Sequence, residues 1–122
     1  MIREERLRST AALRHSLPLT SWRGRSGRRY VVGVHACGEP DLADVTDAVV
    51  IAVERDGDGR ARLVGASAPG RRTARLSRLG WLDAARRSGA TELHVHRLAD
   101  SEAERHAVLA DLASDAASSC PA

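Results

Sequence analysis

Short apolar runs, separated by glycine, proline and aspartate, characterise the first half of the chain. Runs of this length that are rich in valine and isoleucine are typical of strands, and the residues between them are typical of turns. Residues 48–53 are continuously apolar, which predicts a central strand buried on both faces. Pro18 limits the first run to a sheet edge, where it would be open to pairing with a second copy in a homodimer. The pattern predicts strands over 17–23, 28–37, 48–53 and 62–68.

Helical spacing appears in the second half of the chain. Leu76, Leu79 and Leu82 recur at intervals of three residues and predict a helix over 72–87, followed by a glycine at its end. Residues 91–98 alternate between apolar and polar and predict another strand. After this strand, Ser101 and Glu104 have the spacing of a helix capping box, so a last helix is expected to begin there.

These elements, in the order β-β-β-β-α-β-α, predict an α+β fold. We expect a mixed, mainly antiparallel sheet of about five strands with helices packed on it. Residues 17–113 form the single expected domain. Residues 1–16 contain many helix formers and predict an N-terminal arm or a short helix, and residues 114–122 predict a disordered tail.

Composition and charge exclude several classes of protein. The chain has no lysine, and its net charge is only +3, so its many arginines do not by themselves indicate a nucleic-acid-binding protein. Cys37 and Cys120 are far apart and imply no disulfide framework. No apolar stretch is long enough for a membrane span or a secretion signal. We therefore expect a cytoplasmic protein that is not associated with membranes.

Arginine is concentrated around the turn predicted between the first two strands. Guanidinium groups and turn amides bind oxyanions, and neighbouring aromatic rings can stack on bases. The predicted anion-binding site contains six residues: Trp22, Arg23, Arg25, Arg28, Arg29 and Tyr30. Its partner would be a nucleic acid, a nucleotide or an acidic protein surface. The alternative is a solvated turn whose arginines pair with carboxylates elsewhere in the fold.

A second candidate site depends on histidine and cysteine. His35 and Cys37 share one face of their predicted strand, and His94 and His96 share one face of theirs. If these strands were neighbours, the four side chains would offer the nitrogen and sulfur ligands that zinc prefers, with Glu92 beside them. The alternative is a set of exposed or half-buried histidines, with Cys37 as a small core residue.

The segment from Gly65 to Leu112 runs strand, turn, helix, strand, helix, with Pro69-Gly70-Arg71-Arg72 at the turn. This order is similar to the cofactor-binding half of acyl-CoA N-acetyltransferases, although the spaced glycines of that family are absent. The resemblance implies a small transferase that holds the pyrophosphate of its cofactor at the start of the helix. No nucleophile motif accompanies it, so a binding or regulatory module without catalytic activity is the main expectation.

Overall fold

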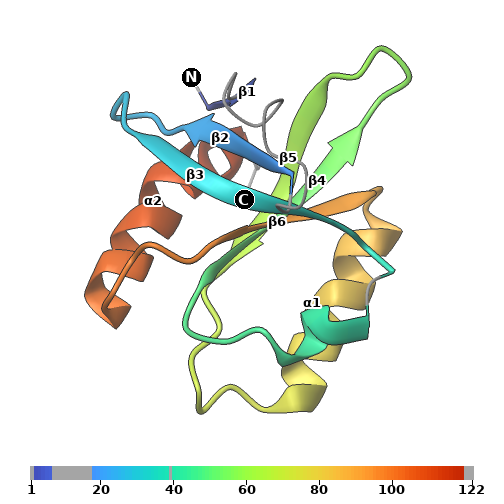
Figure 1. The fold of residues 1–122 in the computed structure, drawn as a ribbon, viewed down its shortest axis with the longest axis vertical. Coiled ribbons are helices and arrows are strands. Elements are labelled where there is room, and N and C mark those ends of the chain that lie inside the picture. Colours follow the sequence, from blue (N-terminus) through green and yellow to red (C-terminus); the bar gives the residue numbers. More distant parts are fainter. Residues whose placement is uncertain (1, 7–17, 39, 120–122) are drawn as a thin grey trace.

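The computed structural model describes residues 2–6, 18–38 and 40–119, which form one curled sheet and the helices packed on it (Figure 1). The predicted α+β class is confirmed, with six strands instead of five. The strands are β1 (Arg3–Arg6), β2 (Leu19–Arg23), β3 (Arg29–Ala36), β4 (Val49–Arg55), β5 (Ala61–Ser67) and β6 (Glu92–His96). The helices are η2, a 3₁₀ helix (Pro40–Asp44), α1 (Arg75–Arg87) and α2 (Glu102–Ser119).

The strand order in the sheet is β1-β2-β3-β6-β4-β5, and every neighbouring pair is antiparallel. A mixed sheet was expected because a helix connects β5 to β6. These two strands do run parallel, but β4 lies between them. The last strand of the sequence, β6, is therefore an inner strand, paired with both β3 and β4.

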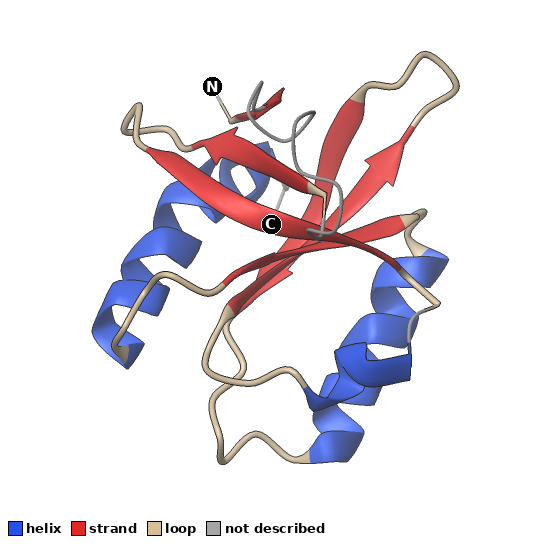
Figure 2. Ribbon diagram, viewed as in Figure 1, coloured by secondary structure: helices blue, strands red, loops and turns tan. Residues whose placement is uncertain are grey.

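The two α-helices cover opposite faces of the sheet, as Figure 2 shows. Successive residues of β4 face the two cores in turn: Val49 and Ile51 pack on the α2 side, and Val50 and Ala52 on the α1 side. The prediction that this strand is buried on both faces is confirmed. The sheet also curls until its edge strands β1 and β5 contact each other.

The N-terminal segment differs from its prediction. Arg3–Arg6 forms a strand that pairs with β2, where an arm or short helix was expected, and residues 7–17 of that segment lie outside the described residues. Ion pairs with arginines of the sheet favour the strand over the helix that local propensity suggested. Because β1 pairs with β2, the strand expected at 17–23 is not an open edge of the sheet. The argument for a homodimer through that edge no longer holds.

The C-terminal segment also differs from its prediction. A disordered tail was expected over 114–122, but α2 continues to Ser119 because its alanine-rich end sustains the helix. Residues 120–122 lie outside the described residues. Among the helices that the structure describes, none is long and apolar enough to cross a membrane.

Candidate functional site

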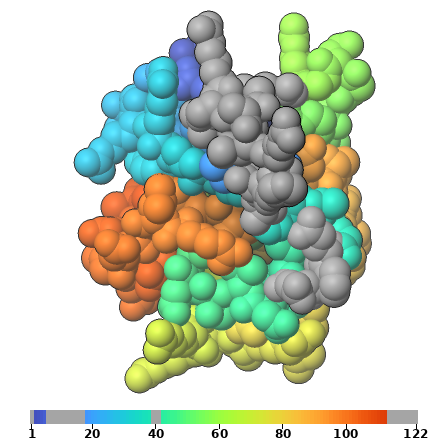
Figure 3. Space-filling model, in the orientation of Figure 1, coloured from blue at the N-terminus to red at the C-terminus, as the bar shows by residue number. Residues whose placement is uncertain are grey.

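One carboxylate anchors the turn between β2 and β3 to α2. Asp111 accepts hydrogen bonds from the Ser26 backbone N–H at 2.8 Å, and from the Ser26 and Tyr30 hydroxyls at 2.7 Å each. Burial acts in the opposite direction, but these donors hold the pKa of Asp111 below its ordinary value. A Cβ atom at Gly24 would lie 2.0 Å from this carboxylate, so the close approach requires glycine. The turn is therefore fixed beside α2 (Figure 3).

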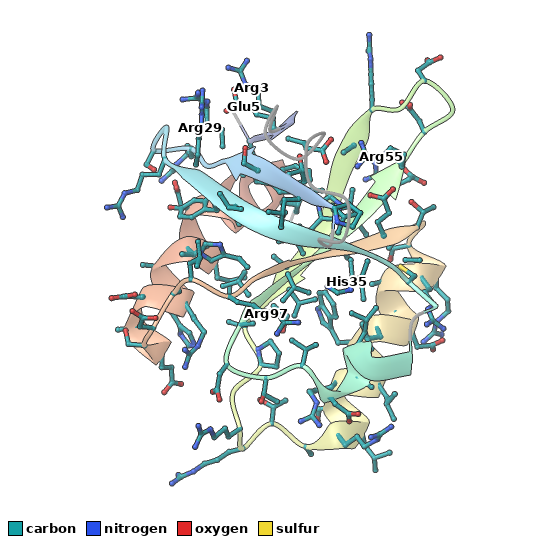
Figure 4. All side chains as sticks on the ribbon, in the orientation of Figure 1. Arg3, Glu5, Arg29, His35, Arg55 and Arg97 are labelled. Carbon is teal, nitrogen blue, oxygen red and sulfur yellow. The ribbon has the colours of Figure 1, made fainter. Side chains whose placement is uncertain are left out.

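Two of the predicted anion-binding arginines already have a carboxylate partner. Arg23 and Arg29 bind Glu5 of β1, with N–O distances of 3.2 and 2.8 Å. Arg3 reaches the same carboxylate at 3.3 Å, and Figure 4 shows this cluster at the hairpin end of the sheet. Three guanidinium groups thus share one negative charge, and the cluster remains positive.

The other two arginines, Arg25 and Arg28, are exposed on the turn. Within the described residues, neither guanidinium forms an ion pair. Both line a groove of about 660 Å³ between the turn and α2, together with His96. With the Glu5 cluster, these residues form what we call the basic hairpin surface: Arg3, Arg23, Arg25, Arg28 and Arg29.

The two aromatic residues of the predicted site face the core. Only 1% of Trp22 and 8% of Tyr30 is exposed. The Tyr30 ring packs edge-on against His96, with ring centroids 5.5 Å apart, and its hydroxyl is bonded to Asp111. Trp22 is enclosed in the core, whereas Tyr30 still lines the groove beside Arg25 and Arg28, and the stacking of these rings on a base stays a prediction.

The proposed metal ligands lie on neighbouring strands but on opposite faces of the sheet. In the register of β3 and β6, His35 stands opposite Leu93 and therefore faces α1. His94 and His96 are the alternate residues of β6 and face α2. Cys37 follows the end of β3, where burial raises the pKa of its thiol. The four side chains do not converge, and in the described parts of the chain no group of three or more His, Cys, Asp or Glu residues could hold a metal ion.

A series of polar contacts instead runs through the interior of the curled sheet. The Trp22 N–H donates to Nδ1 of His94 at 2.9 Å, and Nε2 of His94 lies 2.9 Å from the Glu92 carboxylate. Arg55 donates from Nη2 to Glu92 at 2.9 Å, and from Nη1 and Nη2 to Glu4 at 2.8 and 2.9 Å. We call these five residues the polar chain. It links β1, β2, β4 and β6.

The polar chain fixes the protonation states of its members. Because the Trp22 N–H can only donate, Nδ1 of His94 accepts and Nε2 carries the proton. Burial lowers the pKa of His94 and keeps the ring neutral. Hydrogen bonds from Arg55 lower the pKa of Glu92, and against the effect of burial they also lower that of Glu4. The polar groups of these five residues are thus paired with one another, as is typical of side chains that hold a sheet together.

The loop that carries the transferase resemblance lies before α1, as the resemblance requires. Two of its polar groups already have partners in the protein. The Gly70 N–H donates to the Thr73 hydroxyl at 3.1 Å, and Arg71 binds Asp47 at 2.9 Å. Arg72 is exposed.

Sequence reasoning missed the carboxylates that organise these regions. Glu4 and Glu5 belong to the segment predicted as an arm or helix, and the mixture of charges in Arg3–Arg6 was the one signal that paired strands were possible. Asp111 is 81 residues from Tyr30 and 85 from Ser26, and no local pattern predicts a contact at that separation.

Comparisons with protein-family models, with the curated proteins and with the solved structures found no match for this chain. The chemistry of its surfaces is therefore the basis for assigning a function.

Proposed function

We propose that this protein is a small binding module whose basic hairpin surface contacts the phosphate backbone of a nucleic acid. The observation that supports it is the pair Arg25 and Arg28, both exposed and without an ion pair in the described part of the chain, on a turn that Asp111 fixes. A turn that is already ordered loses little conformational entropy when it binds a partner. Guanidinium forks match the oxygens of phosphate in geometry and charge.

Charge and shape favour nucleic acid over an acidic protein. Among the described residues, the five arginines of the basic hairpin surface and its groove face three carboxylates, Glu5, Glu104 and Asp111, which leaves a positive excess. Protein interfaces usually contain an apolar centre. Among the described residues, the large exposed hydrophobic residues are Leu76, Leu79 and Leu98, and of these only Leu98 lines the groove beside Arg25 and Arg28, which is one apolar side chain and not an apolar centre. Since Trp22 and Tyr30 are buried, we expect binding through charge alone, with little preference for base sequence.

The salt dependence of binding tests this function. Fluorescence anisotropy of a labelled oligonucleotide, repeated over a range of sodium chloride concentrations, gives the slope of log K against log salt. We expect the double substitution Arg25→Ala with Arg28→Ala to weaken binding and reduce the magnitude of that slope by about 2. Arg60→Ala with Arg72→Ala is the matched control, because both arginines are exposed elsewhere on the molecule. Equal slopes in the two double variants would contradict the proposal.

A further inference from the structure

A second group of arginines meets at the end of β6, away from the basic hairpin surface. It surrounds a hollow of about 420 Å³ that receives residues from the loop before β4, the loop before α1, the end of β6 and α2. Figure 4 labels one of them, Arg97, between the two α-helices. We call this site the arginine hollow, and its lining residues are Asp47, Arg71, Arg97, Ala99, Asp100 and Arg105.

Asp47 organises two of these arginines. Its backbone has a φ of 56°, in the left-handed region, and its N–H donates to the Pro69 carbonyl at 2.8 Å. Residues other than glycine in this region are uncommon and often mark functional sites. One carboxylate oxygen of Asp47 binds Arg71 at 2.9 Å, and the other lies 3.6 Å from Arg105. Arg105 also donates to the Ala99 carbonyl at 3.3 Å, with 12% of its side chain exposed. The Arg105 guanidinium is thus positioned in advance, whereas Arg71, with 86% of its side chain exposed, is oriented through its ion pair with Asp47.

The hollow retains donors that the protein does not use. A guanidinium has five N–H donors, and Arg71 uses its Nε for Asp47. Arg97 is exposed and, among the residues that the structure describes, forms neither a hydrogen bond nor an ion pair. Three guanidinium groups face two carboxylates, Asp47 and Asp100, so one positive charge remains.

We infer that the arginine hollow binds a dianionic phosphate group, either inorganic phosphate or the terminal phosphate of a small phosphomonoester. A tetrahedral phosphate has enough oxygens to accept from several guanidinium forks at once, whereas a carboxylate has two. This site is independent of the basic hairpin surface, because the two share no residue.

Amide chemical shifts in two-dimensional NMR test the inference. Sodium phosphate replaces sodium chloride at constant ionic strength, and separate titrations use sodium acetate and glycerol 3-phosphate. We expect saturable shifts at Asp47, Arg97 and the first turn of α2 with both phosphates, and weaker binding of acetate. Tighter binding of inorganic phosphate would identify the free ion as the ligand, and tighter binding of glycerol 3-phosphate would identify a phosphomonoester. Shifts that are unsaturable, or that cluster at the β2–β3 turn, would overturn the site.

Substitutions give the matched comparison. Arg97→Gln is expected to weaken phosphate binding about tenfold, since it removes one charged donor. Arg72→Gln changes an exposed arginine of the neighbouring loop and should leave the affinity unaltered. Asp100→Asn removes a repulsive charge and should strengthen binding. The inference is wrong if Arg97→Gln and Arg72→Gln have the same affinity, or if Asp100→Asn does not bind more tightly than the wild type.

Discussion

The interior of the curled sheet and its hairpin end use arginine in different ways. Inside, Arg55 lies between Glu4 and Glu92, with 19% of its side chain exposed, and the hydrogen bonds that it donates to both carboxylates raise its pKa. At the hairpin, Arg25 and Arg28 are exposed and form no ion pair within the described residues. An arginine with carboxylates on both sides stabilises the fold, whereas one with unused donors on an ordered turn is available to a partner. The number of arginines alone does not distinguish these roles.

Removing the central arginine of the polar chain should have the largest effect on stability. Arg55→Met leaves Glu4 and Glu92 without their shared cation, and we expect a loss of about 3 kcal/mol in the free energy of unfolding. Arg62→Met is the control, because its ion pair with Glu54 is exposed and should contribute less than about 1 kcal/mol. Urea unfolding followed by tryptophan fluorescence measures both. Equal losses would remove the distinction between paired and exposed arginines.

The anchor of the hairpin should come next. Asp111→Ala removes the acceptor for the Ser26 N–H and hydroxyl and for the Tyr30 hydroxyl, and should cost about 2 kcal/mol. Asp83→Ala breaks an exposed pair with Arg87 on α1 and should cost about 0.4 kcal/mol. Amide hydrogen exchange at Ser26 should accelerate only in the first variant. Unchanged exchange there would mean that Asp111 does not hold the turn.

Acid should weaken the interior of the curled sheet, where His94, Glu92 and Glu4 take up protons. The pKa of His94 is lower in the folded than in the unfolded state, so the unfolded chain takes up a proton first as the pH falls below about 6.5. Stability should then fall by at most about 2 kcal/mol by about pH 5. The lowered pKa values of Glu92 and Glu4 extend the loss to lower pH, because their contribution is present above the unfolded pKa and disappears as they are protonated.

Histidine variants separate this effect from general acid sensitivity. His94→Gln should remove the part of the loss that begins near pH 6.5. His106→Gln is the control, since 61% of that side chain is exposed. Unfolding free energies measured across the same pH range decide between them. An unaltered pH profile in His94→Gln would show that another group titrates.

The smallest effect is expected for an exposed hairpin arginine. Arg25→Ala should leave the free energy of unfolding within about 0.5 kcal/mol of the wild type, because no ion pair of the described residues is lost. The same variant should bind an oligonucleotide more weakly. A stability loss as large as that of Asp111→Ala would assign this arginine to the fold.

Local patterns predicted most of the elements, because periodicity and turn residues act over a few positions. The alternation along β6 correctly placed His94 and His96 on one face, and Ser101 does cap α2 by accepting from the Glu104 N–H at 3.1 Å. Which face of the sheet His94 and His96 occupy depends on strand order and register, and contacts between residues distant in sequence determine both. For that reason the convergence of His35 with His94 was not excluded by the sequence.

The candidate sites were less predictable than the elements. The arginine-rich turn was visible in the sequence, but the division between Arg23, which pairs with Glu5, and Arg25, which does not, depends on β1. Charged side chains are a common feature of edge strands. In β1 the same charged residues favoured the prediction of an arm or a short helix. The arginine hollow combines four separate segments and has no local signature.

The central position of β6 has a consequence for synthesis of the chain. While only the residues before β6 have been made, β3 and β4 lack the strand that lies between them and expose two unpaired edges. Exposed edges of this kind are sites where nascent chains associate incorrectly, and pairings distant in sequence form slowly. The sheet becomes continuous only after Glu92–His96 has emerged from the ribosome. Chains truncated after α1 should therefore depend most strongly on chaperones.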